Sequence, residues 1–346
     1  MNDAPAIGNQ FEKTFVRLQQ LDQFLNGADH LLILPHNNPD PDAIASALAL
    51  KFLAEQRYAL SATIAYQGIV GRAENRALVR YLRYPMKRLT PADFAKASHL
   101  ALVDTQPGAG NNPLPPTVTP GLVLDHHEYR TASDEVAFTD IRPQMGATSS
   151  ILVEYLRCAE LEIAPSLATA LFYGVKTDTQ GLERKATESD REAFCHLLQF
   201  VDLEALFKIE RAQLPGDYFR TLAQALRLAK HYDDVMIAFL GEVSYPDLAA
   251  NIAELLMRHQ GTRWVICAGV YKDALYISVR TNQKRGAGQL IQQVVGKRGR
   301  AGGHGSMAGA QVPLAGDNAE TLMNGFINDF LSHLDRTGVQ AGRPFI

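Results

Sequence analysis

Several short apolar runs in the first half of the chain are followed by side chains that can bind metal ions. Short apolar runs are typical of buried strands, and open α/β sheets bind ligands at the carboxyl ends of their strands. The metal-capable side chains after these runs are His36, Asp40, Asp42, Asp104, Asp125, His126, His127 and Asp178. Together they offer enough imidazole and carboxylate groups for two metal ions that share a ligand.

The triplet Asp125-His126-His127 is the most informative of these groups, because adjacent histidines preceded by a carboxylate are unusual. Two adjacent side chains point in different directions, so we expect different roles for the two imidazoles. One can ligate a metal while the other faces a substrate phosphate, and Asp125 can accept an N–H and fix a histidine tautomer. The alternative is a partly buried histidine pair that is satisfied by its neighbours.

The segment from His36 to Asp42 also has a purely structural interpretation. Asp40 before Pro41 is a natural helix start, with aspartate as the N-cap and proline at the first helical position. Helix propensity does not call for His36 or Asp42, however, and a metal role accounts for all three side chains.

Asp104 and Asp178 are ambiguous when each is taken alone. Asp104 can be an ordinary turn residue, but a two-metal site needs one carboxylate to bridge ions roughly 3.5–4 Å apart, and Asp104 is the candidate. Asp178 can simply end a helix. A bare carboxylate there opposes the helix dipole, and a bound cation would resolve that conflict.

A glycine-rich segment, Gly302-Gly303-His304, and Arg280 form a second signal near the end of the chain. Glycine lets a backbone approach a ligand closely, and arginine can bind phosphate through two parallel hydrogen bonds. Basic residues gathered around such a loop suit an anionic substrate. The alternative is a solvated basic loop.

Length and composition exclude several classes of protein. A chain of 346 residues with 46% hydrophobic residues can form two domains. Its formal net charge of −3 gives no global basic field for long nucleic acids, so phosphate recognition must be local. Three scattered cysteines, no secretory signal and no apolar span predict a cytoplasmic protein without a membrane partner.

Strand-like runs at 30–35, 60–66, 98–103 and 121–125 alternate with helix-like runs such as 42–56 and 73–83. This alternation predicts an α/β fold with a mostly parallel sheet covered on both faces. Further strands at 263–270 and 274–280 predict a second, smaller α/β domain, with the active-site cleft between the two. The predicted boundaries are 1–202 for the first domain, 203–232 for linker helices and 233–346 for the second domain.

These motifs together resemble the DHH phosphoesterase superfamily, in its branch with a DHHA1 C-terminal domain. The opening motif matches His36 to Ser46, and Asp104, the triplet and Asp178 match the second, third and fourth motifs in order. Gly302-Gly303-His304 resembles the glycine-glycine-glycine-histidine signature. The departures are Pro41, Ala45 and Ala301 at positions where glycine is usual, and none removes a ligand.

The resemblance implies a binuclear manganese hydrolase of phosphate esters, with Mg²⁺ or Co²⁺ as alternatives. One ion would be held by His36, Asp40 and Asp104. The other would be held by Asp42, Asp104, His126 and Asp178. His127, Arg280 and His304, with the backbone of Gly302 and Gly303, would bind the substrate phosphate beside Asp125. A water that bridges two metals has a depressed pKa, so it supplies hydroxide for attack on phosphorus.

Within the superfamily, the chain resembles the NrnA-type enzymes. These enzymes degrade very short RNAs (nanoRNA) and linear dinucleotides, and dephosphorylate 3′-phosphoadenosine-5′-phosphate. The alternatives are a RecJ-like single-strand exonuclease, a cyclic-dinucleotide phosphodiesterase and a non-enzymatic nucleotide-binding regulator. The sequence indicates no obligate protein partner. A homodimer and the roles of Arg72 and Asn75 stay open.

Overall fold

The computed structural model describes residues 7–284, 286–336 and 342–346, without the side chains of residues 7–10 and 304. The chain divides into two compact units, Met1–Ala212 and Gln213–Ile346. The segment 203–232, expected to be linker helices, is divided between the units. Helix α8 (Leu203–Glu210) belongs to the first unit and α9 (Gly216–Leu228) to the second.

The first unit is built on a six-stranded sheet in the order β3-β2-β1-β4-β5-β6, and every pair of neighbours is parallel. Its strands are β1 (His30–Pro35), β2 (Ser61–Tyr66), β3 (Met86–Arg88), β4 (His99–Val103), β5 (Leu122–Asp125) and β6 (Phe138–Ile141). The strand order reverses between β1 and β4. In open α/β sheets, ligands bind at the carboxyl ends of the two strands that flank such a reversal.

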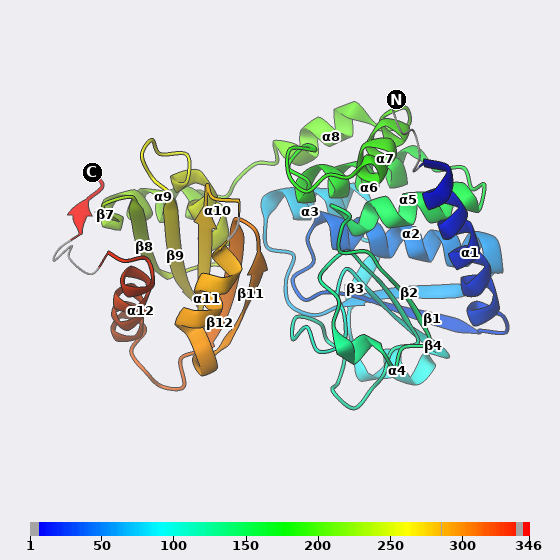
Figure 1. The fold of residues 1–346 in the computed structure, drawn as a ribbon, viewed down its shortest axis with the longest axis horizontal. Helices are drawn as coiled ribbons and strands as arrows, with labels where there is room; N and C mark the ends of the chain where they lie inside the picture. Colours follow the sequence, from blue (N-terminus) through cyan, green and yellow to red (C-terminus); the bar gives the residue numbers. More distant parts are fainter. Residues whose placement is uncertain (1–6, 285, 337–341) are drawn as a thin grey trace, which may run out of the picture. The chain divides into compact units, whose positions relative to one another are not determined.

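Both faces of this sheet are covered, so its central strands are continuous apolar runs. In β1, Leu31 and Ile33 belong to the large core under the helices, whereas Leu32 and Leu34 belong to the core on the opposite face. Figure 1 shows the layer of helices over one face and α4 beneath the other. The helices before α8 are α1 (Ile7–Leu25), α2 (Pro41–Tyr58), α3 (Ala73–Tyr81), α4 (Pro91–Lys96), α5 (Thr148–Cys158), α6 (Pro165–Asp178) and α7 (Glu188–Leu198).

The second unit has a seven-stranded mixed sheet in the order β11-β12-β10-β9-β8-β7-β13. Its strands are β7 (Lys230–Tyr232), β8 (Val235–Glu242), β9 (Trp264–Tyr271), β10 (Ala274–Thr281), β11 (Arg300–His304), β12 (Met307–Pro313) and β13 (Arg343–Pro344). Its other helices are α10 (Leu248–Leu256), α11 (Ala287–Val295) and α12 (Ala319–His333). The predicted fold class, a parallel-sheet α/β domain followed by a smaller α/β domain, is therefore confirmed. Among the described residues, no helix is both long and apolar enough to cross a membrane.

Candidate metal centre

Six predicted ligands come together at the carboxyl edge of the first sheet. They lie after β1, β4 and β5, in the first turn of α2 and at the end of α6. Their ligand atoms form two groups, each with atoms within 4.8 Å of one another: His36, Asp40 and Asp104 in one, and Asp42, His126 and Asp178 in the other. A third such group contains Asp104, His126 and His127. The first two groups match the ion assignments that the resemblance implied, except that Asp104 does not fall in the group of Asp42 and Asp178.

The first group combines a metal-capable cluster with a helix cap. Asp40 is the N-cap of α2, and its Oδ1 accepts a hydrogen bond from the backbone N–H of Ala43 at 3.0 Å. The same Oδ1 lies 3.6 Å from His36 Nε2, which lies 3.5 Å from Asp104 Oδ2. The capping interpretation of Asp40 is therefore correct, and it does not compete with a ligand role.

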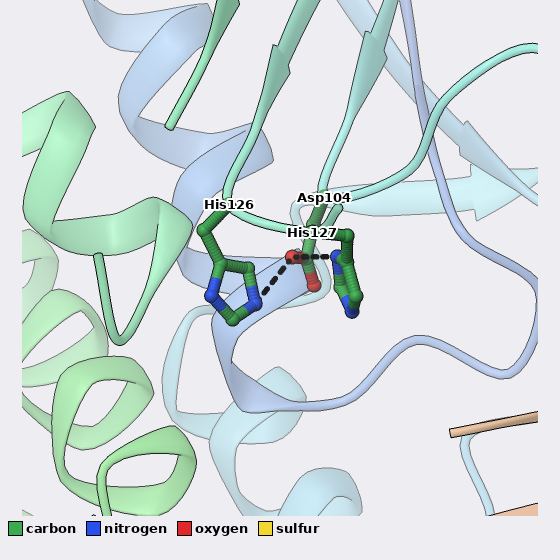
Figure 2. A group of neighbouring side chains, drawn as sticks. All are labelled: Asp104, His126 and His127. Carbon is green, nitrogen blue, oxygen red and sulfur yellow. Dashed lines mark ion pairs between the residues drawn. The ribbon is translucent and has the colours of Figure 1, made fainter. Parts of the chain in front are cut away.

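Asp104 lies between the two groups and presents one oxygen to each. Its Oδ2 faces His36 Nε2, and its Oδ1 lies 3.5 Å from His126 Nε2. Figure 2 shows its carboxylate between the imidazoles of His126 and His127, the latter with Nδ1 3.7 Å from Oδ1. Asp104 is 1% exposed, and its backbone has φ 59°, a left-handed conformation that costs free energy for a residue other than glycine. The fold holds the carboxylate at this position despite that strain.

Backbone carbonyls fix the imidazoles so that both Nε2 atoms point into the cluster. The Nδ1 of His36 lies 2.9 Å from the carbonyl oxygen of Asn37, and the Nδ1 of His126 lies 3.2 Å from that of Met145. A carbonyl can only accept, so each Nδ1 carries the hydrogen. Metal-ligating histidines characteristically donate their other ring N–H in this way.

Two buried atoms of the cluster fit a cation. Within the described part of the chain, Asp104 Oδ2 and His126 Nε2 have no hydrogen-bond partner, although both are inaccessible to solvent. Buried polar atoms are rarely left unsatisfied, and each of these two points at another potential ligand. His126 Nε2, for example, lies 3.4 Å from Asp178 Oδ2. Oxygen and imidazole donors of this kind suit Mn²⁺, Mg²⁺ or Co²⁺, so the residues fit the metals that the sequence implied.

The pKa values of the carboxylates show that the cluster holds too much buried negative charge for isolated side chains. Burial, followed by the charge of Asp178, raises the pKa of Asp42 to about 7. Burial, followed by the charges of Asp42 and Asp40, holds the pKa of Asp104 well above its ordinary value. Divalent cations would lower both pKa values again, because positive charge favours the ionised carboxylates.

The two imidazoles have raised pKa values in the same field. Burial acts to lower the pKa of His36, but the charge and hydrogen bond of Asp40 outweigh it and raise the pKa to about 9. Burial likewise acts against protonation of His126, and the nearby carboxylate of Asp178 outweighs it and raises the pKa to about 9. Without metal, protons on these imidazoles therefore balance part of the negative charge, and a cation must displace them to bind.

Two residues that the sequence did not single out hold the carboxylates in place. Both backbone N–H groups at the start of α5 donate to Asp42, from Thr148 to Oδ2 and from Ser149 to Oδ1, each at 2.7 Å. The hydroxyl of Thr148 also donates to Asp104 Oδ1 at 2.9 Å. The amino end of α5 thus anchors one carboxylate of the second group together with the carboxylate that the groups share. The one feature of the sequence that could have indicated this role is the polar pair Thr148-Ser149 before an apolar helical run.

The predicted carboxylate–histidine pair is present beside the cluster. Asp125 Oδ1 lies 2.7 Å from His127 Nδ1. Burial acts to raise the pKa of Asp125, but this hydrogen bond, the charges of both imidazoles and the hydrogen bond from Gln106 together hold it below its ordinary value. Gln106, which is 1% exposed, donates to Asp125 Oδ2 at 2.7 Å and accepts from the backbone N–H of Arg130 at 2.9 Å. Gln106 therefore connects Asp125 to the loop that carries His127. No pattern in the sequence indicated this role.

The other predicted substrate-binding residues belong to the second unit. Arg280, which is 9% exposed, is the penultimate residue of β10 and donates to Ser278 Oγ at 2.8 Å and to Glu254 Oε1 at 3.0 Å. Gly302, Gly303 and His304 form the end of β11, and the side chain of His304 lies outside the described part. A Cβ at Gly303 would lie 2.4 Å from Ala308 Cα, so glycine is needed there for the pairing of β11 with β12.

Known proteins resemble this chain at the level of family and fold. The model for the DHH family, N-terminal domain, matches residues 30–175. An uncharacterized protein of Methanocaldococcus jannaschii is 35% identical over 291 residues, covering 82% of this chain and 58% of that protein, so the chain spans less than two thirds of this relative. A probable manganese-dependent inorganic pyrophosphatase of Listeria monocytogenes is 25% identical over 231 residues, 65% of this chain and 74% of that protein.

The crystal structure of an exopolyphosphatase-related protein from Bacteroides fragilis has the same fold. It aligns with a TM-score of 0.74 and 15% identity, and the alignment covers 98% of this chain and 100% of that one.

Proposed function

Because this chain belongs to the DHH superfamily, we propose that it is a metal-dependent phosphoesterase that uses two divalent cations. Mn²⁺ is the proposed metal, with Mg²⁺ or Co²⁺ as alternatives. The similarity to a probable manganese-dependent pyrophosphatase supports this choice, as do the hard oxygen donors of the cluster. His36, Asp40 and Asp104 would hold one ion, and Asp42, Asp104, His126 and Asp178 the other.

The observation that carries the proposal is the position of Asp104. One carboxylate faces a histidine of each group through a different oxygen, an arrangement that suits a ligand bridging two ions. If Asp104 served only in a structural ion pair, one histidine would be enough. When bound, the two cations would lower the pKa of a water molecule and neutralise charge that develops on the phosphate.

The remaining polar side chains would bind and orient the substrate. Asp125 fixes the ring of His127, which we propose contacts the phosphate next to the metals. Arg280 and His304, with Gly302 and Gly303, would bind phosphate from the second unit. An arginine that is held on both sides by neighbouring side chains loses little freedom when it binds a ligand, which suits a phosphate-binding role.

Short oligonucleotides (nanoRNA and linear dinucleotides), 3′-phosphoadenosine-5′-phosphate, or both are the proposed substrates. The resemblance of the motifs to the NrnA-type enzymes supports this class. The pyrophosphatase relative makes inorganic pyrophosphate the competing substrate to test. The same fold could also serve a RecJ-like exonuclease, a cyclic-dinucleotide phosphodiesterase or a nucleotide-binding regulator, and the experiments below distinguish these three from the proposed enzyme.

The proposal is tested by metal stoichiometry together with a panel of substrates. Protein stripped with chelator should lack activity, and added Mn²⁺ should restore it with two ions bound per chain. Asp104→Asn should bind fewer ions and lose hydrolysis, whereas the buried helix-capping carboxylate Asp93 gives a matched control, Asp93→Asn, that should retain both. An Asp104→Asn protein with two tightly bound ions would show that the bridging role is wrong.

The substrate panel contains end-labelled RNA of graded length, 3′-phosphoadenosine-5′-phosphate, a cyclic dinucleotide and inorganic pyrophosphate. We expect the highest catalytic efficiency on RNAs of a few nucleotides or on 3′-phosphoadenosine-5′-phosphate. Preference for pyrophosphate, for the cyclic dinucleotide, or for a twenty-nucleotide strand over a few nucleotides would contradict the proposed substrate class while leaving the metal centre intact. Binding of nucleotides without any turnover would indicate a regulator.

A further inference from the structure

A row of basic side chains runs along α3 and into β3, in a chain whose formal net charge is −3. Residues 72–88 contain six basic residues and a single acidic one, Glu74. The basic residues, called here the α3–β3 basic track, are Arg72, Arg76, Arg80, Arg83, Lys87 and Arg88. The first three are spaced four residues apart, which places them on one face of the helix.

The track begins beside the candidate metal centre. Asn38, which lies in the loop between His36 and Asp40, donates its N–H to the carbonyl of Gln67 at 3.1 Å and accepts from the N–H of Ile69 at 2.8 Å. The loop that leads into α3 is therefore tied to the loop that carries two candidate ligands.

From there the track leads away from the metals. Helix α3 connects two parallel strands, so it runs from the carboxyl edge of the sheet towards the amino edge. Eight residues separate Arg72 from Arg80, which corresponds to about 12 Å of helix. After the turn that follows α3, strand β3 runs back to the carboxyl edge, where Arg88 ends it and the Arg88 guanidinium lies 5.0 Å from the centre of the Tyr66 ring.

The far part of the track is exposed and carries charge that its neighbours do not cancel. Arg80 and Arg83 are exposed, and neither forms an ion pair within the described part of the chain. Lys87 does pair with Asp93. The acidic side chains of α8, the helix that packs against α3, are matched by lysines: Glu204 pairs with Lys208 and Glu210 with Lys176.

An aromatic ring, Tyr84, stands in the turn between α3 and β3, next to Arg83. Tyr84 is 67% exposed, and both Arg83 and Tyr84 have left-handed backbone conformations, with φ of 57° and 58°. Two consecutive left-handed residues other than glycine cost conformational free energy, so the surrounding fold must hold this tight turn in place. The turn presents the Tyr84 ring to solvent. Exposed aromatic rings between arginines are characteristic of surfaces that bind single-stranded nucleic acid, because bases stack on the ring while cations bind phosphates.

We propose that the α3–β3 basic track binds the tail of a single-stranded oligonucleotide whose reacting phosphate lies at the metal centre. This inference rests on the proposed function and specifies which substrates it favours. At roughly 3.4 Å per nucleotide of a stacked strand, the helical part of the track, about 12 Å from Arg72 to Arg80, holds three to four nucleotides. Affinity should therefore increase from a dinucleotide to an RNA of about five nucleotides and change little beyond that length.

The test compares the double variant Arg80→Gln/Arg83→Gln with a control of equal charge change, Arg17→Gln/Arg191→Gln. Both control residues are exposed and lie on other helices of the first unit. Three readouts are needed: hydrolysis of bis(p-nitrophenyl) phosphate with Mn²⁺, KM for RNAs of graded length, and the salt dependence of RNA binding by metal-free protein, measured by fluorescence anisotropy.

Only the track variant should weaken binding of the five-nucleotide RNA, with hydrolysis of the small diester unchanged. The slope of log affinity against log salt concentration should fall in magnitude by about 1.4, since each lost phosphate contact removes about 0.7 for a single strand. Tyr84→Ala should weaken five-nucleotide binding by about 5- to 150-fold, and Tyr84→Trp should not.

Equal loss of binding in the track and control variants would overturn the proposal, because it would show that RNA affinity depends only on the net charge of the protein. Wild-type affinity that does not depend on RNA length would also overturn it, even if the small diester is hydrolysed. The opposite result, length-dependent binding without any phosphoester hydrolysis in Mn²⁺, would support the track and refute the proposed enzyme.

Discussion

The close packing of α6 against the metal centre predicts that alanine at position 174 will disturb Asp42. A Cβ on Gly174 would lie 2.5 Å from Ser149 Oγ, 3.1 Å from Asp42 Cα and 3.2 Å from Asp42 Oδ1. Carbon and oxygen atoms at 2.5 Å are far inside van der Waals contact, and the backbone of Asp42 is part of the crowded shell. Gly174→Ala must therefore push α6 away, or displace Ser149 and the carboxylate that its N–H binds.

The expected magnitude combines two opposing effects. Alanine is favoured over glycine inside a helix by roughly 0.5–1 kcal/mol, whereas an extra methyl group in a well-packed core costs typically about 1–3 kcal/mol. The net loss should be about 0–2.5 kcal/mol, which corresponds to a decrease in Tm of up to roughly 10 °C for a unit of this size. If the shift of Ser149 displaces Asp42, the affinity for metal should fall by about 10- to 100-fold.

Thermal unfolding and calorimetric titration with Mn²⁺ provide the assay, and a second helical glycine provides the control. Gly325 in α12 is exposed, and a Cβ there would have no atom within 4 Å, so Gly325→Ala should be neutral or slightly stabilising. Adding Ser149→Ala to Gly174→Ala removes the nearest obstructing atom and should recover part of the stability and metal affinity. If Gly174→Ala matches Gly325→Ala in both measurements, close packing does not position Asp42.

Two further predictions concern protons and orientation. In metal-free protein, His36 and His126 have pKa values of about 9 against an ordinary 6.5, so their stabilising contribution is complete below pH 6.5 and is lost as the pH rises through 9. Tm without metal should fall over this range, and a flat profile from pH 6.5 to 9 would contradict the shifts. Gln106→Met removes the donor to Asp125 that steadies the His127 loop. It should keep both metals and slow hydrolysis by about 10- to 100-fold, and unchanged kinetics would rule out an orienting role.

The candidate ligands could be found from the sequence because two simple regularities act together. Buried parallel strands are continuous apolar runs, so β1, β4 and β5 were predicted to within one residue at each end. The carboxyl ends of parallel strands meet at one edge, so polar residues after those runs had to converge. His36, Asp104 and His126 follow directly from this geometry, although their metal-binding role stays a prediction.

Elements without a strong apolar period were missed. Strand β3 is three residues long with two exposed basic side chains, and it is a strand only because β2 offers it an edge. Helix α11 was not among the elements predicted from the sequence. It forms because Leu290, Ile291 and Val294 pack into the core of the second unit, and this packing outweighs the glycines around it.

The start of α5 shows why the supporting shell of the site could not be predicted and also why it matters. The N-cap position of α5 is Ala147, which has no side chain to satisfy the first free N–H groups of the helix. Asp42, more than a hundred residues earlier in the chain, accepts from two of them. A cap that is missing locally is thus supplied by a side chain that only the folded structure brings near. Burial disfavours the ionised form of Asp42, and the positive end of α5 stabilises that form. Folding of α5 and formation of the metal centre therefore depend on the same side chain, so substitution of Asp42 should affect both.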